Sequence, residues 1–277
     1  MPQALVYETS RNLPKTRRIM SAVAAGLERR HYAIEIRDSW EYPQGDETEA
    51  DLIAIWGDFH GTERIFADRH AFKRLLHIDN GYIQRGHFKG YYSVTYNAKQ
   101  AHRVLWELPC PSGDRWRALG ESIHRWRKSG SKILALGLSR KQCGNLGFEY
   151  PSVNRELQRA LHTATNMPVA MREKRYDQKD EPLRDVLRKG SWHSVAGYHT
   201  KGLIEALLEG RPILALHPCA AQSMGNESLE EVLTPCYPDN REEFFIRLAY
   251  HQWTLEEIRQ SHPWRKDSPL RIIGRIT

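Results

Sequence analysis

The sequence has 277 residues, of which 40% are hydrophobic and 27% are charged, so two medium domains fit and the composition excludes a disordered, collagen-like or disulfide-stapled protein. Its 41 Lys and Arg residues exceed its 34 Asp and Glu residues by seven, which suits a polyanionic partner, although a solvated basic surface would give the same excess. No apolar run approaches the ~20 residues of a membrane-spanning helix and no secretory signal is recognisable at the start, which predicts a cytoplasmic protein with no membrane partner.

The first half of the chain alternates short apolar runs with segments of helical period. A helix is predicted over 15–30, where Ile19, Val23 and Leu27 recur at a spacing of four. Strands are predicted at 4–7, 32–36, 52–56 and 75–78, and further helices at 62–70 and 114–128. This order predicts a parallel sheet with helices around it, and a glycine and serine break after the last helix places a domain boundary near residue 130.

The second half repeats this alternation. Strands are predicted at 132–136, 168–172, 192–195 and 212–216, and helices at 153–163, 183–188, 201–209 and throughout the tail at 241–261. Two such series predict an α/β protein made of two doubly wound, Rossmann-like domains, 1–130 and 131–277, which face each other across a cleft, with the helical tail returning toward the first domain. A single mixed domain is the alternative.

The loop after the strand at 192–195 carries the most informative pattern. His199, Thr200, Lys201 and Gly202 stand where this small polar loop turns into a helix. Backbone N–H groups and the positive end of the helix dipole favour an anion there, and Lys201 adds a charge, which predicts a diphosphate site. Glu205, one turn further on, is placed to reach a ribose diol. In the purely structural interpretation, Thr200 caps the helix and Glu205 merely suits the dipole.

Four short motifs follow one another in a suggestive order. They are W-G after a strand at 56–57, D-N-G-Y at 79–82, E-A-L-x-x-G-x-P at 205–212, and L-A-Y-x-Q-W-T-x-x-E-I at 248–258. In this order they resemble GT-B-fold glycosyltransferases, above all small enzymes of bacteriophages that modify hydroxymethylated DNA bases. The resemblance implies a nucleotide sugar, UDP-glucose first, as co-substrate without a prosthetic group, and double-stranded DNA as acceptor. A phage enzyme would act in the host cytoplasm.

The resemblance also gives roles to basic and aromatic side chains. Arg172 and Lys174, on one side of an extended chain, would face the donor phosphates together with the loop at 199–202 and Glu205. Arg140, after the predicted strand at 132–136, would contact a phosphate or the acceptor. Tyr82 and Arg85 would contact the acceptor.

Transfer to a hydroxyl group requires a proton acceptor, unless a leaving phosphate takes that role. Asp58 is favoured, because Asp58 and His60 share a glycine-flanked turn, and Asp79 is the second candidate. Each aspartate could instead cap a helix, and the choice between inversion and retention stays open. The chain has no D-x-D pair, and its four cysteines lack metal-ligand spacing, which predicts transfer without a metal ion.

Tryptophans with basic neighbours occur at 115–117, 125–128 and 264–266. They suit a DNA acceptor, since Arg contacts phosphate and Trp can stack on an extruded base, but Trp116 and Trp126 have the helical spacing of core anchors. Two alternatives stay open: a glycosyltransferase acting on a polysaccharide or a small molecule, and a noncatalytic DNA-binding protein. We expect a monomer.

Overall fold

The computed structural model describes the chain except for residues 10–13, 60, 86–89, 102–105, 174–180, 267, 269 and 271–277. The chain forms two compact units: unit 1 comprises Met1–Arg115 and Ile246–Thr277, and unit 2 comprises Trp116–Phe245. The sequence-based boundary lies near 130 and keeps the tail with the second domain, whereas the structure gives the end of the chain to unit 1. Within the ranges that the structure describes, no helix is both long and apolar enough to cross a bilayer.

Unit 1 is built on a mixed sheet with the strand order β10-β5-β4-β3-β1-β2. Its strands are β1 (Gln3–Glu8), β2 (Ala33–Asp38), β3 (Leu52–Trp56), β4 (Leu75–Asn80), β5 (Tyr92–Tyr96) and β10 (Gln252–Trp253), and its helices are α1 (Pro14–Glu28), α2 (Thr62–Ala67) and α9 (Leu255–Arg259). Strands β1 to β4 pair in parallel, as predicted, but β5 is antiparallel to β4 and β10 is antiparallel to β5. The prediction of a purely parallel sheet is therefore wrong at this side, because antiparallel neighbours need no helical crossover.

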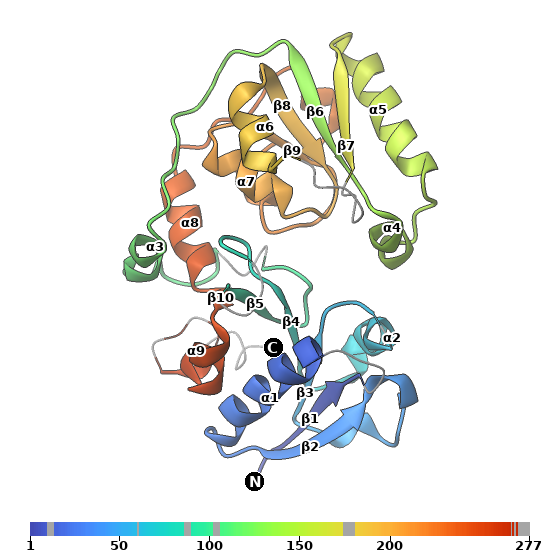
Figure 1. Cartoon of the computed structure of the whole chain (residues 1–277), viewed down its shortest axis with the longest axis vertical. Coiled ribbons are helices and arrows are strands. Elements are labelled where there is room, and N and C mark those ends of the chain that lie inside the picture. The colour runs from blue at the N-terminus through green and yellow to red at the C-terminus, as the bar shows by residue number, and fades with distance from the viewer. Residues whose placement is uncertain are drawn as a thin grey trace. The chain divides into compact units, whose positions relative to one another are not determined.

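Both faces of this sheet are covered, with α1 and α9 on one face and α2 on the other (Figure 1). Ala4 and Val6 of β1 pack in the core of α1, whereas Leu5 and Tyr7 pack with α2. This alternation follows from the period of two in a strand. The apolar stripe predicted on α1 is buried as expected.

The tail forms part of the sheet rather than continuous helix. After α8 (Arg241–Ala249), Gln252 and Trp253 pair with Ser93 and Tyr92. The Gln252 side chain is buried, and its Oε1 accepts hydrogen bonds from the backbone N–H groups of Tyr82 and Ile83 at 2.8 and 2.9 Å. The prediction of a wholly helical tail is wrong here, because tertiary pairing decides the conformation of these two residues.

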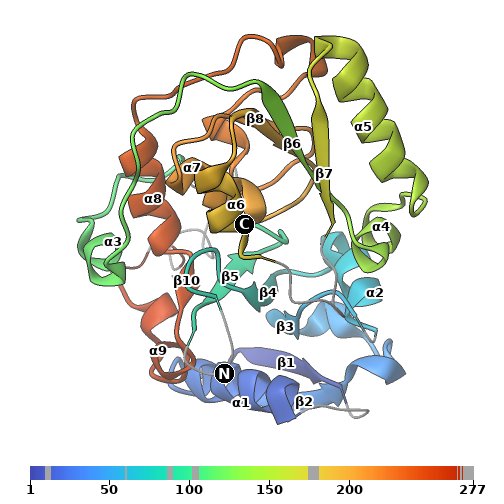
Figure 2. The ribbon, with the colours of Figure 1, turned by 45° about the horizontal axis from the view of Figure 1, so that its top comes forward.

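Unit 2 is built on a parallel sheet with the strand order β7-β6-β8-β9. Its strands are β6 (Lys132–Gly137), β7 (Val169–Glu173), β8 (Trp192–Gly197) and β9 (Ile213–Ala215), and its helices are α4 (Arg140–Leu146), α5 (Ser152–Thr165), α6 (Leu183–Lys189) and α7 (Gly202–Leu208). Helix α5 runs along β6 and β7 in both views (Figures 1 and 2). Ile133 and Ala135 pack beneath it, and Leu136 faces the opposite way, against Gly202 of α7.

The predicted helix at 114–128 is much shorter than expected. Helix α3 spans Asp114–Leu119 and ends where Gly120 adopts a left-handed conformation with φ +63. Glycine takes this conformation without steric cost and commonly ends helices.

The two units share one strand order. Numbered within each unit, the parallel strands run 2-1-3-4, as β2-β1-β3-β4 and as β7-β6-β8-β9. The α/β class with parallel strands is thus confirmed. In each sheet the chain reverses its direction of growth between the first and third strands, and ligands of such folds bind beyond the carboxyl ends of the strands at this switch point.

Candidate functional site

The switch point of unit 2 joins the two loops that the sequence singled out. Strands β6 and β8 are parallel neighbours, with Leu136 opposite Gly197. The loop that leads to Arg140 and the loop that leads to Lys201 therefore leave the same edge of the sheet. We call this edge, formed by 138–141, 198–202 and the residues directly after β9, the unit 2 carboxyl edge.

The loop after β6 is held firmly in place. Ser139 caps α4 in a capping box with Gln142. Asn154 of α5 accepts a hydrogen bond from the Leu138 N–H at 2.8 Å and donates one to the Leu138 carbonyl at 2.9 Å. Arg140, the first residue of α4, is exposed, and its guanidinium lies 5.5 Å from the centroid of the Tyr150 ring. A fixed backbone thus presents this cation at the carboxyl edge.

The loop after β8 brings the predicted donor residues together. Helix α7 begins at Gly202 rather than at Lys201, and Thr200 Oγ1 accepts a hydrogen bond from the Gly202 N–H at 3.2 Å. A Cβ atom at Gly202 would lie 2.7 Å from Cδ1 of Leu136. Gly202 therefore lets α7 approach β6 closely, which is a packing role. Lys201 and Glu205 are both half-buried.

His199 has a defined tautomer if its ring is neutral. Its Nδ1 atom lies 2.6 Å from the carbonyl oxygen of Pro218. A carbonyl oxygen only accepts, so Nδ1 carries the proton and Nε2 is the acceptor nitrogen. The site thus has a hydrogen-bond acceptor beside the cationic loop.

His217 is a site residue that the sequence analysis missed. It follows β9, and its ring centroid lies 5.8 Å from that of His199 and 6.3 Å from that of Phe148. Its Nδ1 atom is buried without a hydrogen-bond partner among the described residues. A polar residue directly after the predicted strand at 212–216 was the available signal, because polar residues at this place face the ligand edge.

The basic pair expected after β7 is only partly described. Arg172 lies next to the end of β7, opposite Leu136 of β6, and its guanidinium donates to the Glu181 carbonyl. Its charge is therefore partly engaged by backbone. Lys174 lies outside the described residues.

The expected catalytic residues belong to unit 1. Asp58 follows β3, with Oδ1 3.6 Å from Nε2 of His77 and Oδ2 3.0 Å from Nζ of Lys99. Burial alone would raise the pKa of the Asp58 carboxyl, but the His77 ring and the Lys99 ammonium more than offset this and hold its pKa well below the usual range. A general base works best with a pKa near the working pH, so Asp58 is a weak proton acceptor while this ion pair is intact.

Asp79, the other carboxylate, is the fifth residue of β4 and is half-buried. Strands β3 and β4 are parallel neighbours with Trp56 opposite Ile78, so Asp79 and Asp58 lie at the same edge of the sheet. His60 lies outside the described residues. Neither His77 nor Lys99 was expected from the sequence, since each is distant from Asp58 along the chain.

The two expected acceptor contacts differ in exposure. The Tyr82 side chain is 1% exposed, and its hydroxyl accepts a hydrogen bond from the Ala101 N–H at 2.8 Å. It anchors the loop after β4 and does not face a solvent-borne acceptor. Arg85 is exposed, and its backbone forms an isolated β-bridge with the backbone of Tyr91.

The tryptophans beside basic residues are packed into the protein. Trp116 is buried and stacks on Phe245, with ring centroids 5.1 Å apart, and Trp264 is also buried. Trp126 is half-buried beneath the guanidinium of Arg241 at 3.8 Å. Trp116 and Trp264 are therefore core residues with no open stacking surface for a base, and Arg241 covers the ring of Trp126.

Among the residues with described positions, no group of three or more His, Cys, Asp or Glu side chains is arranged to hold a metal ion.

Comparison with known proteins gives two informative structures. No protein-family model and no curated protein sequence matches the chain. The KpsC beta Kdo 2,7 transferase of Thermosulfurimonas dismutans has a TM-score of 0.51 and 10% identity, over 99% of this chain and 100% of that chain. The KpsC beta Kdo 2,4 transferase of the same organism has a TM-score of 0.51 and 12% identity, over 89% and 90%. The chain therefore has a glycosyltransferase-like fold.

Proposed function

We propose that the protein is a glycosyltransferase that binds a nucleotide-activated sugar at the unit 2 carboxyl edge. The observation that carries this proposal is the parallel pairing of β6 and β8, which brings Arg140 and the loop of Lys201 to one switch point. The fold shared with two sugar transferases supports it. The proposal includes the GT-B arrangement of two Rossmann-like domains, and the equal strand order of the two sheets supports that part.

In the proposed reaction the acceptor hydroxyl oxygen attacks the anomeric carbon of the sugar. The bond from that carbon to the phosphate oxygen breaks, and the nucleotide leaves with the electron pair. Arg140 and Lys201 would neutralise the leaving phosphate by charge-assisted hydrogen bonds, and Glu205 would bind the ribose diol. UDP-glucose is the donor that we propose first, and transfer would proceed without a metal ion.

The hydroxyl proton goes to a carboxylate of unit 1 in this proposal. Because His77 and Lys99 lower the pKa of the Asp58 carboxyl, we assign the proton to Asp79 first and keep Asp58 as the alternative. Arg172 and Lys174 would assist on the donor side, and His60 and Arg85 on the acceptor side.

The proposed acceptor is a hydroxymethylated pyrimidine in double-stranded DNA. Its support is the excess of seven positive charges and the resemblance of the four motifs. A carbohydrate acceptor is the second candidate, and two observations favour it: both structural neighbours are named as Kdo transferases, and Trp116 and Trp264 are buried.

The deciding experiment offers labelled donors to several acceptors. Labelled UDP-glucose and nucleotide-activated Kdo are each incubated with DNA containing 5-hydroxymethylcytosine or 5-hydroxymethyluracil, with unmodified DNA, and with Kdo-terminated oligosaccharides. Label on modified DNA alone supports the first acceptor, and label on the oligosaccharide supports the second. If no acceptor gains label and neither donor is hydrolysed, the proposed activity is refuted.

A matched set of variants tests the place of the donor site. Arg140→Gln and Lys201→Gln are each expected to weaken binding of the free nucleotide about tenfold, because each removes one charge-assisted contact. Lys132→Gln is the control, since Lys132 is an exposed cation at the opposite, amino end of β6. Equal affinity of all three variants for the nucleotide, measured by calorimetry, would place the donor elsewhere.

A further inference from the structure

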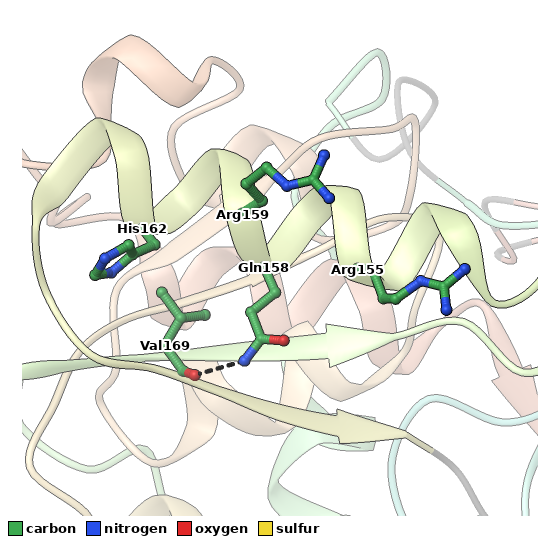
Figure 3. A pocket seen from close by; sticks show the side chains of 5 residues that line it. All are labelled: Arg155, Gln158, Arg159, His162 and Val169. Atoms are coloured by element: carbon green, nitrogen blue, oxygen red, sulfur yellow. Dashed lines mark hydrogen bonds between the residues drawn. The ribbon is translucent and has the colours of Figure 1, made fainter.

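A row of basic side chains on α5 lines a shallow groove beside β7 (Figure 3). The groove has a volume of about 310 Å³ and is lined by Arg155, Gln158, Arg159, His162 and Val169. The four residues from α5 are all exposed. Strand β7 lies at the edge of the unit 2 sheet, so the groove is open along its length.

The two guanidiniums of this row lack an anionic partner. In the part of the chain that the structure describes, neither Arg155 nor Arg159 makes a hydrogen bond or an ion pair through its side chain. Like charges four residues apart on a helix repel and weaken it. The charge of the two guanidiniums is therefore available for an anion from outside the chain.

Two neighbouring polar side chains occupy backbone carbonyl groups at this edge of the sheet. Gln158 Nε2 donates to the carbonyl oxygen of Val169 at 3.1 Å, as Figure 3 shows, and His162 Nδ1 lies 3.1 Å from the carbonyl oxygen of Met167. An extended peptide that added to this edge would need such carbonyls free. The groove therefore recognises charge rather than an added strand.

The row starts at the unit 2 carboxyl edge. Asn154, directly before Arg155, holds Leu138 of the β6 loop through two hydrogen bonds. From Arg155 to His162 the helix rises about 10 Å, at about 1.5 Å per residue. The row thus leads from the neighbourhood of Arg140 along the side of unit 2.

We propose that Arg155 and Arg159 bind the phosphate backbone of duplex DNA. The two arginines are one helical turn apart, about 6 Å along α5, and one DNA strand carries a phosphate about every 3.4 Å of its axis, so both cations can meet a phosphate of the same strand, whereas a polyanion with sparser charges meets fewer of them at once. Such contacts position the duplex and carry no sequence information. The idea that this duplex is also the sugar acceptor rests on the proposed function. Binding of the duplex to the row does not depend on it.

The test compares two double variants that each lose two positive charges. R155Q/R159Q removes the guanidiniums of the row and keeps good helix formers. R17Q/R29Q is the matched control, because both arginines are exposed in unit 1, Arg17 on α1 and Arg29 directly after it. Binding of a short, fluorescein-labelled, unmodified duplex is measured by anisotropy from about 50 to about 200 mM salt. Circular dichroism establishes that each variant is folded, and hydrolysis of UDP-glucose without DNA is measured in parallel.

We expect R155Q/R159Q to bind the duplex at least about tenfold more weakly at low salt and to reduce the slope of log Kd against log salt by about 1.8, which corresponds to two phosphate contacts. R17Q/R29Q should keep the wild-type slope.

Equal slopes for both variants, or no binding of the duplex by the wild type, overturns the proposal. Binding of polygalacturonate through the row, with no binding of the duplex, would assign it to an acidic polysaccharide and also overturns it. If the wild type neither labels an acceptor nor hydrolyses a donor but the slope difference is intact, the proposed function is refuted and the DNA-binding surface is still supported.

Discussion

The Nδ1 atom of His199 lies 2.6 Å from the carbonyl oxygen of Pro218. This hydrogen bond joins the loop after β8 to the loop after β9, and it directs Nε2 as the acceptor nitrogen of a neutral ring. Two roles are thereby combined in one side chain, because one nitrogen holds the loops together and the other can accept a hydrogen bond.

Variants of His199 separate these roles. In His199→Asn the amide nitrogen is attached to Cγ as Nδ1 is, so it can still donate to Pro218, and we expect stability within about 0.5 kcal/mol of wild type. His199→Ala should lose about 1 kcal/mol. Both should bind the nucleotide more weakly, because the loop at 199–202 belongs to the proposed donor site. Urea unfolding and calorimetry with the nucleotide measure the two effects, and wild-type affinity of His199→Asn would remove the Nε2 atom from the donor site.

The Asp58–Lys99 ion pair predicts a loss of stability that depends on pH. The pKa of Asp58 in the folded protein lies below its usual value, so its contribution is present at neutral pH and is lost as the pH falls below about 4, where the unfolded chain takes up the proton. Asp58→Asn should therefore cost about 2 kcal/mol at pH 7 and progressively less below pH 4. Urea unfolding at pH 7 and at a pH below 4 measures this difference in the free energy of unfolding.

Lys99→Met and Lys73→Met form a matched pair for the same prediction. Lys99 and Asp58 are both mostly buried, whereas Lys73 and Asp51 form an exposed pair at 3.3 Å. We expect a loss of about 2 kcal/mol for Lys99→Met and less than about 0.5 kcal/mol for Lys73→Met. Equal losses would mean that burial does not strengthen the Asp58 pair.

His251 should make unit 1 sensitive to mild acid. Burial lowers the pKa of its ring to about 4, so the folded protein holds it neutral while the unfolded chain binds a proton below about 6.5. Stability that is present above this pH is lost as the pH falls toward 4, by up to about 3 kcal/mol. His251→Phe should flatten this part of the stability profile, whereas the exposed His162→Gln should leave it unchanged. A profile that is the same in both variants would contradict a buried neutral His251.

Glu209 is expected to be essential for the stability of unit 2. Its side chain is fully buried, with Oε1 2.7 Å from Nε of Arg184 and Oε2 2.8 Å from Nε of Arg188. Glu209→Gln removes the buried charge that the two guanidiniums share, although Arg184 keeps Glu121 and Arg188 keeps Asp185, and it should cost about 3 kcal/mol, with little dependence on salt. Glu256→Gln, which breaks the exposed pair with Arg259, is the control and should cost less than about 0.5 kcal/mol. Thermal unfolding at low and high salt compares the two, and a cost below 1 kcal/mol for Glu209→Gln would contradict the prediction.

Hydropathy alternation predicted the parallel part of both sheets well. The apolar runs at 52–56 and 132–136 correspond to β3 and β6, because a parallel strand is buried on both faces and its residues are uniformly apolar. The pattern could not reveal β5 or β10, since the first contains alternating hydroxyl-bearing residues and the second is two residues long. Their conformation is decided by pairing with segments far away in the chain.

The candidate site was predictable only where its residues follow strands. Arg140 and Lys201 could be placed at one edge because β6 and β8 were recognised as strands of one parallel sheet. His77 and Lys99 could not be paired with Asp58, because no spacing along the chain relates three residues that different loops and strands supply. The interpretation of Trp264 as a stacking residue failed for the same reason, since its burial depends on the packing of α1 and α9.

The pairing of β10 with β5 has a consequence for how the polypeptide matures. Unit 1 needs residues from both ends of the chain, and the whole of unit 2 is synthesised between them. As the nascent polypeptide leaves the ribosome, unit 2 can complete its sheet first. The sheet of unit 1 is complete only after Gln252 and Trp253 have emerged. The segment that is translated first is thus the last to reach its final structure.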